Sequence, residues 1–114
     1  MMRIMLKSKL HRLTVTETHL DYEGSIAIDK ALLAKADIIP GERVQIVNID
    51  NGQRFETYAI PGGAGKVSLN GGAARLGSKG DRIIVIAYAI MNDKEAKKIR
   101  PNVILVDERN KIKR

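Results

Sequence analysis

The chain has 114 residues, a formal net charge of +7 and 44% hydrophobic residues, so it suits one compact domain and is too short for two independent cores. The absence of cysteine excludes a disulfide framework, a thiolate nucleophile and a cysteine-ligated zinc or iron–sulfur site. The longest apolar run, residues 83–91, is far shorter than the roughly 20 residues of a membrane-spanning helix, and no apolar stretch follows the basic N-terminus as in a secretory signal. We therefore expect a cytoplasmic enzyme or binding module.

The first part of the chain predicts two strands and a helix. Polar and apolar residues alternate over residues 12–16, which predicts a strand, and residues 25–28 form a second short extended segment. Asp29 stands where it can cap a helix over residues 30–35, whose alanines and leucines favour that structure. Residues 40–41, Pro-Gly, predict a turn that closes this section.

The middle of the chain predicts a β-hairpin. Residues 43–49 alternate again and are followed at once by Asn51-Gly52. This dipeptide suits a type I′ turn, so residues 53–60 should return antiparallel to the preceding strand. The Pro- and Gly-rich residues 61–65 predict a flexible loop after the hairpin.

The last part predicts further short elements. Residues 66–69 read as a short strand and residues 70–74 as a tight turn or a single helical turn. Residues 82–90 form a nearly continuous apolar strand, which we expect to be buried on both faces. Residues 93–99 predict a short helix stopped by a proline, and residues 102–106 a last strand. Many short strands with one or two small helices predict a single, mostly-β closed barrel without internal repeats.

Basic residues gather near both ends of the chain, and they have three readings: solvated surface, a nucleic-acid site or a site for a small anion. With no Trp, one Phe and three Tyr, the chain has little material for stacking bases, so the charge is better suited to carboxylates. The terminal clusters are Arg3, Lys7, Lys9 and Arg12 at the start, and Arg109, Lys111, Lys113 and Arg114 at the end.

Several short motifs carry reactive side chains, although each has an ordinary structural explanation. Gly24-Ser25 places a hydroxyl next to an unhindered carbonyl, yet it is also common turn chemistry. Lys9 and His11 flank an apolar residue and would share one side of an extended segment. Arg54 follows the Asn-Gly turn, and a basic or aromatic residue on a half-exposed strand is unremarkable.

Taken together, the motifs resemble the aspartate 1-decarboxylase family, whose pyruvoyl-dependent members make β-alanine for pantothenate and coenzyme A synthesis. The resemblance runs from Met5 to about Pro101 and depends on five ordered segments. They are residues 5–12 (MLKSKLHR), 20–29 (LDYEGSIAID), 51–58 (NGQRFETY), 70–74 (NGGAA) and 80–88 (GDRIIVIAY).

The resemblance implies a double-psi β-barrel with one or two short helices, a single self-processing domain over residues 1–114, and a homotetramer with active sites between subunits. By the same resemblance the precursor, a zymogen, cuts itself between Gly24 and Ser25 into a β chain, residues 1–24, and an α chain, residues 25–114. Ser25 becomes a covalent pyruvoyl group, the cofactor, which forms a Schiff base with L-aspartate and accepts the electrons left when carbon dioxide departs.

The resemblance also implies roles for further residues. Thr57 and Asn70 would assist cleavage together with Gly24 and Ser25, and Tyr58 would be the proton donor in decarboxylation. The residues implied in substrate binding are Lys9, His11, Arg54, Thr57, Gly71, Gly72 and Ala73. Gly72 departs from the family pattern, which usually has alanine there, so we expect a looser turn that changes affinity or maturation rate rather than reaction type.

Two other functions remain open from the sequence. A small basic β-barrel that binds nucleic acid would explain the charge, and an inactive relative would survive as an assembly subunit. The decarboxylase reading implies L-aspartate as the partner and neither a nucleic acid, a membrane nor a metal, and it leaves a maturation factor as a candidate partner.

Overall fold

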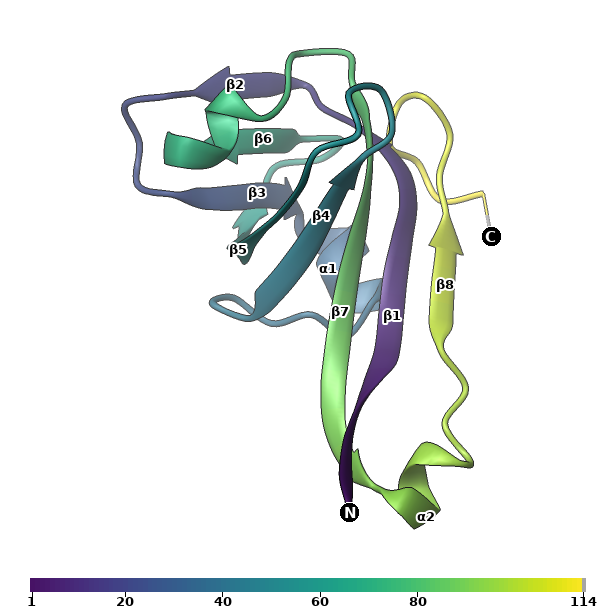
Figure 1. The fold of residues 1–114 in the computed structure, drawn as a ribbon. Coiled ribbons are helices and arrows are strands. Elements are labelled where there is room, and N and C mark those ends of the chain that lie inside the picture. The colour runs from purple at the N-terminus through teal and green to yellow at the C-terminus, as the bar shows by residue number, and fades with distance from the viewer. Residues whose placement is uncertain (114) are drawn as a thin grey trace.

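The computed structural model describes residues 1–113; Arg114 of the C-terminal basic cluster lies outside the described residues. The elements follow one another as β1 (Met2–Thr14), β2 (Glu17–His19), β3 (Ser25–Asp29), α1 (Lys30–Lys35), β4 (Arg43–Asn48), β5 (Arg54–Gly62), β6 (Val67–Asn70), the 3₁₀ helix η1 (Gly71–Arg75), β7 (Arg82–Asn92), α2 (Asp93–Ala96) and β8 (Asn102–Leu105). The strands form one mixed sheet in the order β2-β6-β3-β5-β4-β7-β1-β8 (Figure 1).

The sheet bends sharply along this order. In Figure 1, β2, β6 and β3 lie crosswise to the long strands β7 and β1. The pairs β1–β8, β2–β6 and β3–β5 are parallel and the other pairs are antiparallel. The prediction of a mostly-β chain with two short helices is confirmed, and the curved mixed sheet is consistent with the expected barrel.

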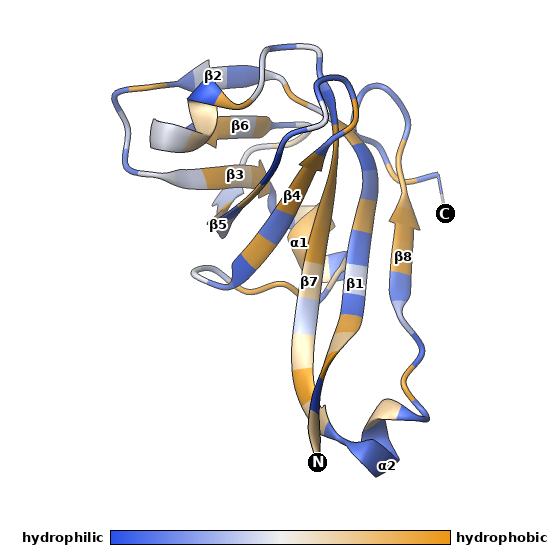
Figure 2. Cartoon of the chain, viewed as in Figure 1, coloured by the Kyte–Doolittle hydropathy of each residue, from blue (hydrophilic) through white to orange (hydrophobic). Residues whose placement is uncertain are grey.

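A single hydrophobic core lies inside this curved sheet. Ile26 of β3, Ile46 of β4, Leu69 of β6 and Val85 of β7 are all fully buried and belong to one cluster. Figure 2 shows the same concentration of hydrophobic residues along β4, β7 and α1. Strands from both halves of the chain therefore share one core, as a single domain requires.

The helix predicted after β3 is confirmed with its cap. The Asp29 carboxylate accepts a hydrogen bond from the Ala31 amide at 2.9 Å, and α1 follows over the predicted residues. The second Asp29 oxygen accepts from the Gly65 amide at 2.8 Å, which ties the end of β3 to the loop before β6. Neither helix in residues 1–113 is long and apolar enough to cross a membrane.

The predicted burial of β7 on both faces is wrong for the second half of the strand. Its exposed fractions reach 41% at Tyr88 and 70% at Ile90, whereas Ile83 and Val85 are fully buried. The cause is the sheet register, because β4 pairs with β7 only up to Ile86. Beyond that residue β7 and β1 continue as a two-stranded ribbon that extends away from the other strands (Figure 1).

The hairpin between β4 and β5 is antiparallel as predicted, but its turn is not type I′. A type I′ turn needs positive φ at both central residues, and only Gly52, at +76°, has it. The loop is longer than a two-residue turn because buried Asn48 holds it by hydrogen bonds. The Asn48 side-chain oxygen accepts from the amides of Asp50 and Asn51 at 2.9 and 3.3 Å. The Gly52 amide then closes the loop on the Asn48 carbonyl at 2.9 Å.

Candidate active site

Ser25, the first residue of β3, lies in a buried polar contact with β6. Its side chain is almost inaccessible, and its exposed fraction is 2%. The Ser25 hydroxyl donates to the Glu23 carbonyl oxygen at 3.2 Å and accepts from Asn70 Nδ2 at 3.0 Å. Asn70 stands directly opposite Ser25 in the antiparallel β3–β6 ladder, so the sheet register brings together two residues that are 45 positions apart.

Gly71, which follows Asn70 and begins η1, packs against the backbone of Gly24. A Cβ atom at position 71 would lie 2.7 Å from both the Cα and the nitrogen of Gly24, and 2.8 Å from the carbonyl oxygen of Tyr22. The φ angle of Gly71 is +64°, a conformation that side-chain-bearing residues rarely adopt. Position 71 therefore needs glycine for two separate reasons, and one of them is contact with the Gly24–Ser25 segment.

Gly72 and Ala73 continue this turn with different surroundings. Gly72 is exposed, has no positive φ, and a Cβ added to it would meet no atom within 4 Å. Ala73 is 7% exposed and belongs to the hydrophobic core. The backbone of Gly72 thus has an ordinary conformation, which alanine could adopt equally well.

Thr57 and Tyr58 lie on β5, the neighbour of β3 on the side away from β6. The parallel ladder of these strands begins with the pair Ile26–Ala59, so Ser25 and Tyr58 each stand one residue before that first pair. Tyr58 is 37% exposed, whereas Thr57 is half-buried. The structure therefore brings both residues to the strand that borders Ser25.

Lys9 and His11 lie on β1, which three strands separate from β3 in the sheet order. They share the half-buried face opposite the buried Leu10, as the sequence predicts. Figure 1 shows β1 and β3 well apart, in agreement with this strand order. Burial, followed by the charges of Arg12 and Lys9, lowers the pKa of His11, which favours the neutral ring.

Arg54 begins β5 at an exposed position, on the same strand face as Glu56 and Tyr58. Glu56 is occupied by Arg43 of β4, whose guanidinium donates to both carboxylate oxygens at 2.7 and 3.2 Å. Within residues 1–113 Arg54 has no ion-pair partner.

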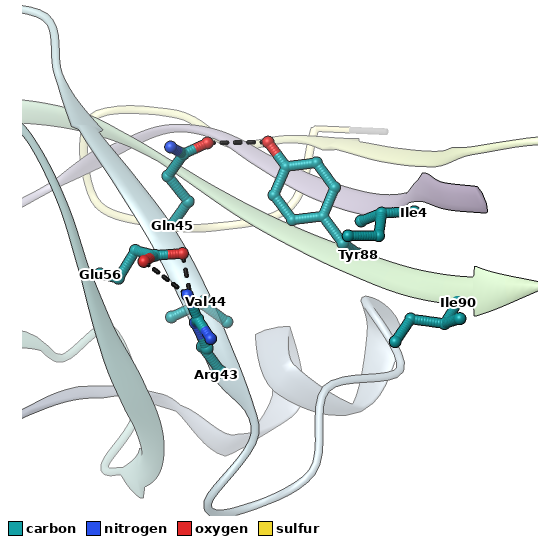
Figure 3. Close-up of a pocket in the computed structure, with 7 residues that line it drawn as sticks. All are labelled: Ile4, Arg43, Val44, Gln45, Glu56, Tyr88 and Ile90. Atoms are coloured by element: carbon teal, nitrogen blue, oxygen red, sulfur yellow. Dashed lines mark hydrogen bonds and ion pairs between the residues drawn. The ribbon is translucent and has the colours of Figure 1, made fainter. Parts of the chain in front are cut away.

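One groove of the structure lies elsewhere. It encloses about 370 Å³, and the Tyr88 hydroxyl donates to Gln45 Oε1 at 2.7 Å along its wall (Figure 3). Its lining residues are Ile4, Arg43, Val44, Gln45, Glu56, Tyr88 and Ile90. None of the residues predicted for the site is among them, so the groove does not identify the site. Residues 1–113 also contain no cluster of three or more His, Asp or Glu side chains suited to a metal ion.

Ser68 is a polar residue of the site that the sequence analysis missed. It is 1% exposed, and its hydroxyl donates to Asn70 Oδ1 at 2.8 Å. The alternation Val67-Ser68-Leu69-Asn70 was the available signal, since it puts Ser68 and Asn70 on the face opposite the two core residues.

Comparison with known proteins gives a consistent result over nearly the whole chain. The model of the family described as aspartate decarboxylase matches residues 1–113. A protein of Thermoanaerobacter pseudethanolicus named aspartate 1-decarboxylase is 58% identical over 113 residues, which cover 97% of each chain. Proteins with the same name from Carboxydothermus hydrogenoformans and Moorella thermoacetica are each 59% identical, over 95% and 98% of this chain and 87% and 89% of their own.

Proposed function

The chain belongs to the aspartate decarboxylase family, and from this membership we propose that it is an aspartate 1-decarboxylase. The enzyme removes the α-carboxylate of L-aspartate as carbon dioxide and forms β-alanine, which supplies pantothenate synthesis. The observation that carries the proposal is the buried contact of Ser25 with Asn70, directly after the Gly24 carbonyl, in a chain that matches the family along its full length.

The first step is cleavage of the chain by its own residues. The Ser25 hydroxyl attacks the Gly24 carbonyl carbon, and the peptide nitrogen takes up a proton as it leaves, so an ester replaces the amide. β-Elimination of the ester releases the chain that ends in the Gly24 carboxylate and leaves dehydroalanine at position 25. Water then adds and ammonia departs, which gives a ketone at the new N-terminus of the α chain.

Three neighbouring groups support the attack, and a fourth residue is assigned to it from the family. Asn70 Nδ2 donates to the Ser25 oxygen, which stabilises negative charge on it, and the Glu23 carbonyl oxygen accepts a hydrogen bond from the Ser25 hydroxyl, which orients the hydroxyl. Gly71 packs against the Gly24 backbone and restricts how that peptide can move. Thr57, on the bordering strand β5, is the further residue that we assign to cleavage.

The pyruvoyl group that results fits the surroundings of Ser25. It would be held at the first residue of β3, and the Asn70 amide, which already donates to an oxygen at this position, suits a carbonyl oxygen equally well. When present, the group supplies a ketone that bonds to the substrate amine and takes up the electron pair that carbon dioxide leaves behind.

The remaining assignments concern L-aspartate. Tyr58 delivers a proton to the former α-carbon, and Arg54 binds a substrate carboxylate through its two-pronged guanidinium. Lys9 and His11 contact the substrate from β1, and the backbone amides of the turn over residues 71–73 approach it from η1. From the family resemblance we propose a homotetramer in the cytoplasm, with active sites formed between subunits. Such sites would let a neighbouring subunit supply the β1 residues, since β1 and β3 lie apart in one chain.

Mass spectrometry of the purified protein tests the cleavage. We expect two chains, residues 1–24 and 25–114, with the larger one lighter than a serine-terminated chain because ammonia is lost, and reactive toward hydrazine. Ser25→Ala should remain a single chain without turnover. Full decarboxylation by Ser25→Ala would refute the mechanism.

Tyr58→Phe tests the proton donor separately. The variant should cleave normally, because the phenol takes no part in the attack on Gly24, while its formation of β-alanine falls. Unchanged β-alanine formation would remove Tyr58 from this role.

A further inference from the structure

Two buried hydroxyls flank the Asn70 side chain. Ser68 lies two residues before Asn70 on β6 and Ser25 lies opposite Asn70 on β3, and the exposed fractions of all three residues are 3% or less. Ser68 Oγ donates to Asn70 Oδ1 at 2.8 Å, and Asn70 Nδ2 donates to Ser25 Oγ at 3.0 Å. The three side chains form one line of donors and acceptors that ends at the hydroxyl next to Gly24.

The direction of this line depends on Ser68. An asparagine amide can rotate by half a turn, which exchanges its oxygen and its nitrogen. In the observed orientation both hydroxyl protons have an acceptor, since Ser68 donates to Asn70 and Ser25 donates to the Glu23 carbonyl. In the rotated orientation Asn70 would donate to Ser68, whose own proton would lose its acceptor in a buried site. Leaving a buried donor unpaired is costly, so Ser68 favours the observed orientation.

We propose that Ser68 is a positioning residue for self-cleavage: its hydroxyl holds the Asn70 amide so that an N–H group, and not a carbonyl oxygen, faces the attacking oxygen of Ser25. The inference rests on the cleavage proposed above. As Ser25 Oγ loses its proton ahead of the attack, an N–H donor stabilises the negative charge that develops on Oγ, whereas an amide oxygen would repel it. When Oγ bonds to the Gly24 carbonyl carbon, this charge passes to the Gly24 carbonyl oxygen. Ser68 thus acts through Asn70 and touches neither the scissile peptide nor the substrate.

The test compares cleavage rates of full-length chains that are purified in urea, refolded together and sampled by mass spectrometry. Ser68→Ala removes the donor to Asn70, and we expect cleavage to slow by about two- to tenfold, the range of a single lost hydrogen bond. Ser68→Cys has nearly the same shape and a weaker donor, so its rate should lie between those of Ser68→Ala and the wild type.

Thr16→Val is the matched control for a general loss of stability. The Thr16 hydroxyl donates to the Val67 carbonyl and accepts from the Val67 amide, both at 2.9 Å, so its loss also removes side-chain hydrogen bonds to β6. It leaves Asn70 untouched, and its cleavage rate should equal that of the wild type. Equal rates for Ser68→Ala and Thr16→Val, or no recovery in Ser68→Cys, would overturn the proposal.

A second measurement keeps the inference separate from the proposed function. If the wild-type chain never cleaves, the proposed self-cleavage fails, and the Asn70 side-chain amide is then observed directly in the intact chain by NMR. We expect slow hydrogen exchange of its protons in the wild type and fast exchange in Ser68→Ala. The same exchange rate in both chains would refute the role of Ser68.

Discussion

Two regions of the molecule carry the proposed chemistry, and they are built differently. The cleavage corner, which we define as Ser25, Ser68, Asn70 and Gly71 with the Gly24 backbone, is held by the β3–β6 ladder and consists of buried side chains in direct contact. The residues proposed to bind aspartate are scattered instead. Arg54 is exposed at the start of β5. Lys9 and His11 lie on β1, which three strands separate from β3.

This difference follows from what each region acts on. The bond that we propose the corner cuts belongs to the chain itself, so folding alone can bring hydroxyl, amide and carbonyl together. Aspartate is a separate molecule, and an exposed guanidinium remains solvated until a carboxylate binds it. We therefore expect changes in the corner to affect cleavage and stability together, and changes at Lys9, His11 and Arg54 to affect turnover only.

Gly71→Ala should have the largest effect. A left-handed backbone and a Cβ placed 2.7 Å from Gly24 are both unfavourable, and together they should lower the free energy of unfolding by about 2–5 kcal/mol. We expect cleavage to stop or to slow strongly, because the Gly24 peptide must move away. Urea unfolding and mass spectrometry measure the two effects.

Gly80→Ala separates the contact from the backbone conformation. Gly80 has φ of +94° and open space around it, so alanine there carries the backbone cost without a collision, about 1–2 kcal/mol. It should cleave at the wild-type rate. Normal cleavage in Gly71→Ala would show that the packing of Gly71 on Gly24 is irrelevant to the reaction.

Arg54→Ala addresses the other region. Losing a hydrogen-bonded charge partner of the substrate, worth about 1.5–3 kcal/mol, should lower kcat/KM for aspartate by roughly 10- to 100-fold. Cleavage into two chains should be complete. Arg43→Ala, on the neighbouring strand, is the control, because Arg43 is already paired with Glu56. Slowed cleavage in Arg54→Ala would show that Arg54 also takes part in cleavage, against the division of the molecule into two regions.

Local features of the fold are predictable from the sequence, and long-range ones are not. The Asp29 cap and α1 follow from neighbouring residues, and both are confirmed. The burial of β7 was predicted wrongly for a long-range reason, since β7 continues beyond the end of its pairing with β4 at Ile86. The wrong turn type has a similar origin, because buried Asn48 reorganises the loop that Asn51-Gly52 alone would close.

The same limit applies to the site. Gly24-Ser25 stands out as a motif, but no periodicity reveals that Asn70 pairs with Ser25 in the sheet. The family resemblance supplied both residues, without the contact between them. The alternation over residues 67–70 places Ser68 on the same strand face as Asn70, but a serine in a short strand carries no signal of function by itself. The role that we propose for it depends on its hydrogen bond to Asn70, which only the structure shows.

Gly72→Ala should have a smaller effect, of opposite sign to Gly71→Ala. Position 72 has an ordinary backbone conformation and free space for a Cβ, so alanine should stabilise the chain by about 0.4–1 kcal/mol by restricting the unfolded state. Cleavage should not slow. A loss of stability in urea unfolding would mean that the turn after Gly71 needs glycine at its second position as well, which would enlarge the cleavage corner.

Glu17→Gln should have the smallest effect, visible only through its dependence on pH. The pKa of Glu17 is lowered, chiefly by a hydrogen bond from Lys66, the residue before β6. His19 lowers it further by a smaller amount, and partial desolvation opposes both effects. A lowered folded-state pKa stabilises the chain above the unfolded-state pKa, and this contribution is lost as the pH falls through the folded-state value. The wild type should therefore be slightly more stable than Glu17→Gln at neutral pH, with the difference in urea midpoint disappearing in acid below about pH 4.

Hydrogen exchange shows where this small effect acts. Glu17 is paired with Ser68 in the parallel β2–β6 ladder. In Glu17→Gln the amides of β2 and β6 should therefore exchange faster at neutral pH than in the wild type. Asp50→Asn is a control outside both regions, because a hydrogen bond from Arg82, the first residue of β7, likewise lowers the pKa of Asp50. Its amides of β2 and β6 should exchange as in the wild type. Faster exchange of these amides in both variants would show that the loss of either carboxylate charge destabilises the whole molecule, and that the cleavage corner does not open as a separate unit.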